Sequence, residues 1–429
     1  MCGAILRVLV TIPNELLRRL QERLGFLTRM PIERTKMNKC ALVSHVVPPS
    51  WSGQAVMIGR LLRDVPENVY CLISNDGNIS GRGKRFISRL PGRYHYLPKE
   101  PRIASWPSRQ PLSTLNILLV LLAVLLRGLR IARILKCEKC SAAAAATGDL
   151  INIPATYFAS RLLRIPFYAY LFDDYIYQWP DDRRSKARFF ESIVARRMAK
   201  VIVPNEFLEQ EIKKRYSGEI CVIHNPCERI DSSGNHRRAM TTLGEIKIVY
   251  TGAVYHINYE AFRLLLAAID KTEFFLTLHI YTADTCESLA REHIFGSRVV
   301  YHDHVPGEQI LDVLKLCDIA FIPFTFSSSV SEVIKTSAPG KLGDYLASGI
   351  PILANVPPDS FVSWYLKKWH CGLVVEVDDA AAVARAITRL VHDTELQADL
   401  SRHALERARI DFDPKKASQK LLSVLGISG

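Results

Sequence analysis

The stretch Ser327–Ala354, SSSVSEVIKTSAPGKLGDYLASGIPILA, decides the fold of this chain. It follows one apolar run, DIAFIPF, and ends in another, IPILA, which is typical of the loop and helix that join two parallel strands. Thr336 and Ser337 are favourable N-cap residues, Pro339 suits a first helical turn, and Gly349 suits a helix end. We therefore predict a βαβ unit whose helix is capped by these two side chains.

The start of this helix has the character of an anion site. Helix N-termini present free backbone N–H groups and the positive end of the helix dipole, and Lys341 adds a full charge in the first turn. Asp344 lies three residues further on, on the same face. Phosphates at the helix start and a carboxylate that accepts hydroxyl hydrogens fit a nucleoside diphosphate with its ribose. The structural alternative is a capped surface helix with a Lys–Asp pair.

Strand-like and helix-like segments alternate along most of the remaining sequence. The expected strands are Ala41–Val47, Val69–Ile73, Asp149–Ile153, Phe167–Phe172, Val201–Pro204, Cys221–Ile223, Ile246–Thr251, Phe275–Ile280, Arg298–Tyr301, Asp318–Ile322, Ile350–Ala354 and Leu373–Glu376. This alternation predicts an α/β protein with two tandem, Rossmann-like, doubly wound domains. A ligand cleft between the domains is expected at the carboxyl ends of both sheets.

A polar stretch without apolar periodicity marks the boundary between these domains. The predicted divisions are a basic N-terminal extension (1–39), a first domain (40–228), a linker (229–245), a second domain (246–410) and a C-terminal helix that packs back on the first domain (411–429). The alanine run Ala142–Ala146 is expected to be a loop or a helix end.

Composition limits the possible partners and the compartment. The net charge of +13 requires a phosphate-bearing, lipid or nucleic-acid partner. Nucleic acid is the least favoured of these, because no nucleic-acid motif is present. Ten cysteines without a dense spacing pattern favour reduced thiols in the cytoplasm. The one C-x-x-C, Cys137–Cys140, has no second pair, so we predict no metal site.

One helical segment combines apolar and basic character. Leu115–Leu126 is almost wholly apolar, and Arg127, Arg130, Arg133 and Lys136 follow it. Twelve residues are too few for a membrane span, which needs about 20. The segment therefore favours peripheral contact with an anionic membrane surface. A helix packed on the sheet with a solvated basic end is the alternative.

The segment from Asp344 to Ile352, DYLASGIPI, resembles the donor-binding signature of GT-B glycosyltransferases close to family GT4, E-Y-L/M-A-x-G-x-P-V/I. Pro339-Gly340-Lys341 is similar to the P-S-K-like turn that precedes it. Ile248–Gly252 resembles the strand and glycine turn that open the family's second domain, and Pro48–Gly59 resembles the glycine-bearing turn after its first strand.

The resemblance implies a set of site residues. On the donor side these are Gly252, His256, Thr336, Ser337, Gly340, Lys341, Leu342 and Asp344, with Asp344 on the ribose hydroxyls. Ser52 and Gly53 would form an acceptor-side loop. Retaining members commonly carry a further glutamate eight positions before the ribose-binding residue, and Thr336 stands there in this chain.

Three residues are candidate bases for an acceptor hydroxyl. Asp173 and Asp174 follow the strand FYAYLF, and His45 ends the first strand, so all three belong to carboxyl ends of strands. The alternative is that one of the two aspartates caps the next helix.

Together these features predict a metal-independent glycosyltransferase without a cofactor, because the nucleotide-sugar is a substrate. The expected acceptor is a glycan or a lipid-linked molecule of surface polysaccharide biosynthesis. The expected location is the cytoplasm, in association with the cytoplasmic face of a membrane. A nucleotide-sugar epimerase of the same fold and a non-catalytic sugar-nucleotide-binding partner are the alternatives.

Overall fold

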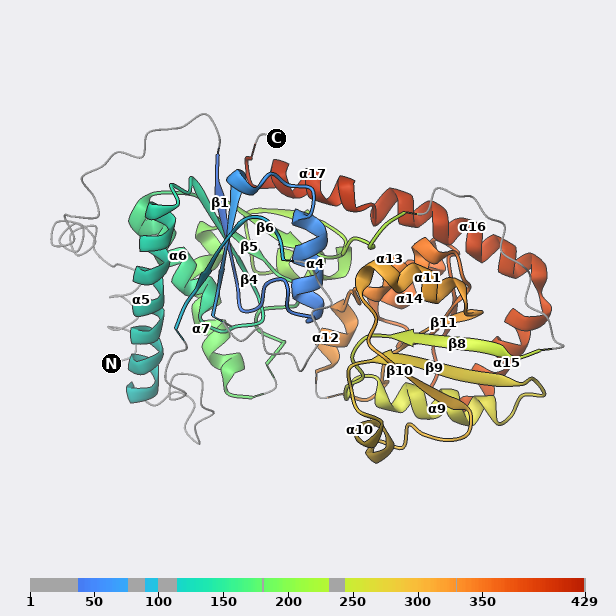
Figure 1. Cartoon of the computed structure of the whole chain (residues 1–429). Coiled ribbons are helices and arrows are strands. Elements are labelled where there is room, and N and C mark those ends of the chain that lie inside the picture. The colour runs from blue at the N-terminus through green and yellow to red at the C-terminus, as the bar shows by residue number, and fades with distance from the viewer. Residues whose placement is uncertain are drawn as a thin grey trace. The chain divides into compact units, whose positions relative to one another are not determined.

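The computed structural model describes residues 38–75, 89–98, 114–179, 181–230, 244–328 and 330–427. These residues form two compact units. Unit 1 contains the described residues up to Ile223 and from Ser418 onwards, and unit 2 contains His224–Ala417. Each unit is a parallel β-sheet with helices on its faces (Figure 1), so the predicted pair of doubly wound α/β domains is confirmed.

Unit 1 is built on a seven-stranded sheet with the order β3-β2-β1-β4-β5-β6-β7, in which every neighbouring pair is parallel. Its strands are β1 (Cys40–Ser44), β2 (Tyr70–Ser74), β3 (Arg93–Tyr96), β4 (Ala142–Ala146), β5 (Phe167–Tyr170), β6 (Lys200–Val203) and β7 (Glu219–Val222). Its helices are α4 (Gly53–Leu62), α5 (Thr114–Cys137), α6 (Asn152–Leu163), α7 (Arg183–Val194) and α8 (Glu206–Lys213). Helix α17 (Pro414–Val424) spans the boundary, and its residues from Ser418 belong to unit 1.

The alanine run is the largest departure from the sequence-based expectation. Ala142–Ala146 is the central strand β4, paired with β1 and β5, and its five side chains are buried. The strand expected at Asp149–Ile153 is wrong. The Asp149 carboxylate accepts the N–H groups of Ile151 and Asn152, both at 2.8 Å, and α6 begins there. Alanine has a weak intrinsic preference for strands, and here burial on both faces decides instead.

Helices α5 and α6 pack together on the seven-stranded sheet of unit 1, with α5 on the outside of the unit (Figure 1). Gly128 makes this close approach possible, because a Cβ there would lie 2.6 Å from Phe158 and 3.0 Å from the Ala155 carbonyl oxygen. The edge strand β3 was not expected, since its sequence, RYHY, lacks an apolar pattern.

Unit 2 is built on a six-stranded parallel sheet with the order β10-β9-β8-β11-β12-β13. Its strands are β8 (Ile246–Thr251), β9 (Leu276–Thr282), β10 (Val299–Asp303), β11 (Ile319–Pro323), β12 (Ile352–Asn355) and β13 (Leu373–Val375). Its helices are α9 (Tyr259–Ile269), α10 (Cys286–Arg291), α11 (Ile310–Lys315), α12 (Ser331–Thr336), α13 (Lys341–Ser348), α14 (Phe361–Lys368), α15 (Ala380–His392) and α16 (Thr394–Asp411).

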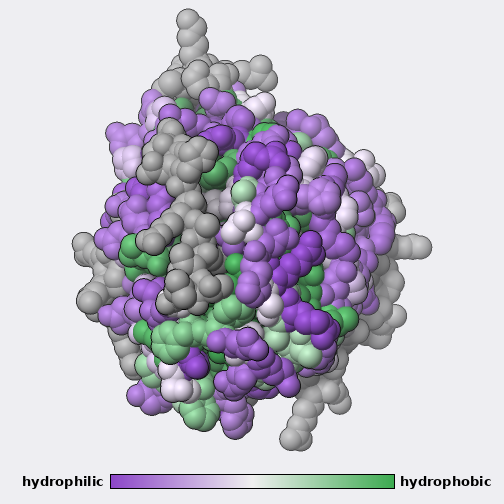
Figure 2. All heavy atoms as spheres, turned by 90° about the vertical axis from the view of Figure 1, so that its right-hand side faces the viewer, coloured by the Kyte–Doolittle hydropathy of each residue, from purple (hydrophilic) through white to green (hydrophobic). Residues whose placement is uncertain are grey.

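The core of unit 2 joins β8 and β9 to α9 and α15. Ile248 and Leu278 from the sheet meet Phe262 of α9 and Ile387 of α15, and all four side chains are fully buried. Seen from the side on which α15 and α16 lie in Figure 1, hydrophilic residues predominate, with smaller hydrophobic areas between them (Figure 2).

Each sheet contains one point at which the strand order reverses direction. This switch point lies between β1 and β4 in unit 1 and between β8 and β11 in unit 2. Open α/β sheets bind their ligands at the carboxyl ends of the strands beside such a point. The topology therefore marks one candidate ligand position in each unit.

Gly343 allows α13 to pack against a neighbouring segment of unit 2, which gives a stability prediction. A Cβ at Gly343 would lie 3.1 Å from the Asn225 carbonyl oxygen and from the Cys227 nitrogen, and 3.0 Å from Phe412. We expect Gly343→Ala to destabilise the protein by about 1–3 kcal/mol through overpacking, measured by urea denaturation. Gly53→Ala is the matched control, because nothing lies within 4 Å of its added Cβ. Equal midpoints for the two variants would contradict this packing.

Candidate functional site

The switch point of unit 2 is formed by the end of β8 and the start of α13. Gly252, directly after β8, has a φ of +106°, a conformation that side chains rarely adopt. A Cβ at this position would lie 3.7 Å from both Cε and Nζ of Lys341. Two of the predicted donor residues, far apart in sequence, are therefore neighbours in this unit.

Lys341 is the most informative residue of this site. Its Nζ lies 3.5 Å from the centroid of the Tyr250 ring, in a cation–π arrangement. Burial holds the pKa of this ammonium well below its ordinary value. Within the described parts of the chain, no carboxylate lies within ion-pair distance of it. A desolvated lysine without a counter-charge gains interaction energy when an anion binds beside it.

Two tyrosines position this lysine and the glycine turn. The Tyr250 hydroxyl donates a hydrogen bond to the Ala253 carbonyl oxygen at 2.6 Å. The Tyr345 hydroxyl, one turn along α13 from Lys341, accepts the Thr251 N–H at 3.0 Å. The sequence-based site omitted both residues, because buried tyrosines in apolar runs look like ordinary core residues.

Asp344 contacts the backbone of the segment that contains Glu228. Its side chain is 5% exposed, and its Oδ1 accepts the Glu228 N–H at 2.8 Å. Asp344 thus fixes a backbone segment of unit 2. Its predicted contact with ribose hydroxyls stays a prediction.

The turn that leads into α13 differs from the expected one. Thr336 ends α12 and donates its hydroxyl to the Glu332 carbonyl oxygen at 3.0 Å, while Ser337 is the C-terminal cap of α12 in extended conformation. The N-cap of α13 is Gly340, without a side-chain cap. The prediction that Thr336 and Ser337 cap this helix is wrong, because a residue before proline, here Ala338, disfavours helical geometry.

The remaining donor-side residues are placed as follows. Leu342 is 1% exposed, and its N–H donates to the Pro339 carbonyl oxygen at 3.0 Å. His256 is exposed and lies beside Tyr255, with 5.8 Å between the ring centroids.

Asn225 is a residue of this site that sequence analysis missed. Its Nδ2 donates to the Ala338 carbonyl oxygen at 2.9 Å, and its buried Oδ1 has no hydrogen-bond partner among the described residues. Its position in VIHNP, beside the polar linker, was the signal in the sequence that could have pointed to it.

The switch point of unit 1 contains His45. Gly148, directly after β4, has a φ of +100°, and a Cβ there would lie 3.0 Å from His45 Nδ1 and 2.8 Å from Gln54 Oε1. The Gln54 amide donates to the Thr147 carbonyl oxygen and to the Ser44 hydroxyl, both at 2.9 Å. His45 therefore lies against the bare backbone of Gly148, where β1 and β4 end.

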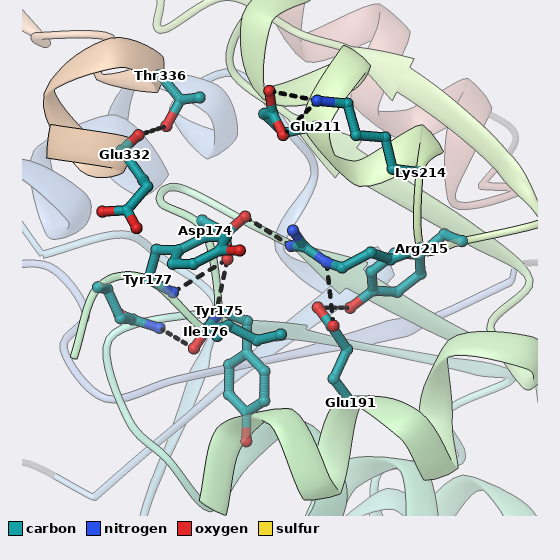
Figure 3. A network of polar contacts seen from close by, with 12 residues as sticks. Asp174, Tyr175, Ile176, Tyr177, Glu191, Glu211, Lys214, Arg215, Glu332 and Thr336 are labelled. Atoms are coloured by element: carbon teal, nitrogen blue, oxygen red, sulfur yellow. Dashed lines mark hydrogen bonds and ion pairs between the residues drawn. The ribbon is translucent and has the colours of Figure 1, made fainter. Parts of the chain in front are cut away.

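The two adjacent aspartates after β5 have different environments. Asp174 is 1% exposed, and its Oδ1 accepts the Ile176 and Tyr177 N–H groups at 2.9 and 3.1 Å. Its Oδ2 accepts a 2.6 Å bond from Arg215, as Figure 3 shows. Both oxygens of Asp174 are thus engaged in holding the turn at residues 175–178, whereas the next helix, α7, begins only after Asp182.

Arg215 extends this network away from β5. Its Nε lies 3.1 Å from Glu191 Oε2 (Figure 3). The Tyr216 hydroxyl donates to Glu191 Oε1 at 3.0 Å. A buried ion network of this kind holds a fixed geometry, and breaking one partner leaves an uncompensated charge.

Asp173 differs from Asp174 in its electrostatic environment. Burial, and then the neighbouring charge of Asp174, raise the pKa of the Asp173 carboxyl to about 6. Such a value suits a general base near neutral pH. The predicted role of Asp173 as the base for an acceptor hydroxyl stays a prediction.

The predicted acceptor-side loop leads into α4. The Ser52 hydroxyl caps this helix by accepting the Ala55 N–H at 3.3 Å. Gly53 is its first residue, and an added Cβ there would face open space.

Residues 245–393 match the family model described as "Glycosyl transferases group 1". The chain matches no protein of curated function.

Several solved structures share the fold over most of the chain. A glycosyltransferase from Rickettsia africae has a TM-score of 0.62 and 14% identity, covering 90% of this chain and 98% of its own. Anabaena Alr3699/HepE in complex with UDP and glucose has a TM-score of 0.61 and 12% identity, covering 91% and 99%. Sucrose-phosphate synthase from Thermosynechococcus elongatus has a TM-score of 0.60 and 14% identity, covering 90% and 98%.

At these identities the structural similarity shows the fold, which is the predicted GT-B fold of two Rossmann-like domains. The family match covers the part of unit 2 that contains Gly252, Lys341 and Asp344. The chain therefore has the two-domain GT-B fold, and its residues 245–393 are similar to the group 1 glycosyltransferases.

Proposed function

We propose that this chain transfers a sugar from a nucleoside-diphosphate sugar to a hydroxyl group of a glycan or lipid-linked acceptor. The observation that carries the proposal is the environment of Lys341. Its ammonium lies over the Tyr250 ring and beside Gly252, and no carboxylate among the described residues pairs with it. In this proposal unit 2 holds the donor, and unit 1 supplies the group that activates the acceptor.

The proposed role of Lys341 is to stabilise the leaving group. When the bond between the sugar and the diphosphate breaks, negative charge develops on the diphosphate oxygen. The Lys341 ammonium and the start of α13 supply a preorganised positive field for that charge. Asp344 accepts hydrogen bonds from the ribose hydroxyls. The reaction proposed here needs no metal and no cofactor.

UDP-glucose is the first donor to test. The Anabaena protein with a similar fold was solved with UDP and glucose and also with UDP-glucose. A second similar fold, from Burkholderia xenovorans, is a UDP-forming trehalose-phosphate synthase. We propose that the acceptor belongs to surface polysaccharide biosynthesis and is used on the cytoplasmic face of a membrane.

The proposed base for the acceptor hydroxyl is Asp173, which gives a pH prediction. Its raised pKa means that the carboxylate form, which accepts the proton, predominates above about pH 6. We expect the turnover rate to fall as pH drops through about 6, and Asp173→Asn to lower it by about 10²–10⁴-fold. The measurement is nucleoside diphosphate release against pH with acceptor present. His45→Gln is the comparison, and an unchanged acid limb in Asp173→Asn would exclude Asp173.

A non-catalytic sugar-nucleotide-binding partner is the second candidate function. Thr336 occupies the position of the further glutamate of retaining relatives, and its hydroxyl donates to the α12 backbone. Such a protein would bind the donor without releasing nucleoside diphosphate.

One experiment separates these functions and the epimerase alternative. Thermal denaturation with UDP-, GDP-, ADP- and dTDP-sugars identifies the donor, because a ligand that binds the folded state raises the midpoint. Nucleoside diphosphate release is then followed with and without candidate acceptors. Acceptor-dependent release supports transfer, conversion of the free donor supports an epimerase, and stabilisation without either supports the non-catalytic partner. No stabilisation by any of the four would contradict the proposal.

A further inference from the structure

The outer face of α5 carries an apolar surface that glycosyl transfer does not explain. Four leucines on this face, Leu118, Leu122, Leu125 and Leu126, are 51, 50, 36 and 44% exposed. Their spacing of four, three and one residues places them on one side of the helix. The other exposed large apolar side chains of the described residues each lie on a different segment of the chain.

The inner face of α5 fixes this orientation. Val120, Ala123 and Ile131 are buried in the core of unit 1. Arg127 points the same way, is 2% exposed, and bonds Asp149 at 2.5 Å and Asn152 at 2.7 Å. The helix therefore has no freedom to turn its leucines inward without breaking a buried ion pair.

The same outer face becomes basic towards the end of the helix. Arg133 is exposed and lies seven residues after Leu126, two turns along the same side. Arg161, at the end of the adjoining α6, is exposed as well. Helix α5 contains no aspartate or glutamate.

We propose that the outer face of α5 docks on an anionic lipid surface, with its leucines in the boundary between headgroups and acyl chains. The basic end of the helix contacts lipid phosphates, consistent with the net charge of +13. Among the described residues, none of the helices is both long enough and apolar enough to span a bilayer. The contact proposed here lies along the surface and requires no glycosyl transfer.

The experiment is co-sedimentation of the full chain with lipid vesicles. Vesicles of phosphatidylcholine containing phosphatidylglycerol are expected to bind the protein, and vesicles of phosphatidylcholine alone to bind it at least about tenfold more weakly. Changing all four leucines to glutamine should weaken binding at least about tenfold, and Arg133→Glu should weaken it at low salt only. Leu316→Gln and Arg385→Glu make the same chemical changes at exposed positions of unit 2 and should bind as the wild type does.

A second readout keeps the test independent of the folding of the fourfold variant. The tryptophan in Leu122→Trp should be quenched by brominated lipid to a greater extent than the native tryptophans in the wild type. Quenching of Leu122→Trp that is no greater than that of the wild type would overturn the proposal. Equal binding of the wild type to both kinds of vesicle would overturn it as well. Sedimentation equilibrium gives a third outcome: a dimer that the fourfold variant abolishes, without vesicle binding, would assign the surface to a second copy of the chain instead. Loss of nucleotide-sugar turnover with intact vesicle binding would contradict only the proposed function.

Discussion

Lys341→Met is expected to weaken UDP binding by roughly 100-fold at neutral pH, a loss of about 2.7 kcal/mol, the size of a hydrogen bond to a charged group. Methionine fills a similar volume and keeps contact with the Tyr250 ring but carries no charge. Isothermal titration calorimetry of both proteins measures the difference directly. Equal affinities would remove Lys341, and with it the observation that carries the proposed function.

The pH dependence of binding tests the same residue in a second way. Burial lowers the pKa of Lys341 in the free protein, and a bound diphosphate raises it again. Binding therefore takes up a proton, so wild-type affinity should fall as pH rises towards alkaline values. The ratio of the two dissociation constants at each pH cancels the titration of the nucleotide itself, and we expect the advantage of the wild type to decrease with pH.

Stability should respond to the same pKa shift with a defined sign. The folded pKa of Lys341 lies below the unfolded one, so unfolding takes up a proton between those two values. The free energy of unfolding then rises with pH in this range for the wild type. Lys341→Met removes this contribution, and urea denaturation against pH would detect its loss.

Tyr250 supplies the matched controls for Lys341. Tyr250→Phe keeps the ring under the ammonium and removes only the contacts of the hydroxyl with the Ala253 carbonyl oxygen and Asn258 Oδ1, so UDP binding should remain close to that of the wild type. Tyr250→Leu removes the ring as well and should weaken binding further. Equal binding by the two Tyr250 variants would show that the cation–π contact does not position the lysine.

The part of the fold that the sequence predicted well is the part with strong local patterns. A helix that ends at Gly349 was expected in this segment, and Gly349 does end α13, with a φ of +68°, a conformation that favours glycine. The two parallel sheets were also predicted, because alternating apolar runs report burial on both faces.

The incorrect predictions have one cause in common: tertiary contacts, and not the local sequence, decide the structure at these positions. Ala142–Ala146 carries no strand signal of its own, and its neighbours β1 and β5 make it a central strand. The spacing of Thr336 and Ser337 suggested a cap, but Pro339 delays the helix. The contact between Lys341 and Tyr250 joins residues far apart in sequence, so no local pattern reports it.

Asp344 requires a test that separates its two roles. In the structure it accepts the Glu228 N–H, and in the proposed function it also accepts the ribose hydroxyls. Asp344→Ala removes both. We expect it to lower the free energy of unfolding by about 1–3 kcal/mol, because a buried N–H loses its acceptor. It should also abolish the thermal stabilisation by the nucleotide-sugar.

Asp344→Asn distinguishes the roles, because an asparagine oxygen still accepts the Glu228 N–H while the charged acceptor is lost. We expect its stability to stay within about 1 kcal/mol of the wild type and its affinity for UDP to fall about tenfold or more, the cost of a hydrogen bond to a charged group. Comparing UDP with 2′-deoxy-UDP completes a thermodynamic cycle: the wild type should lose affinity for the deoxy ligand, and Asp344→Asn should discriminate far less. If the variant discriminated as strongly as the wild type, Asp344 would be a backbone anchor alone, and the ribose would be bound elsewhere.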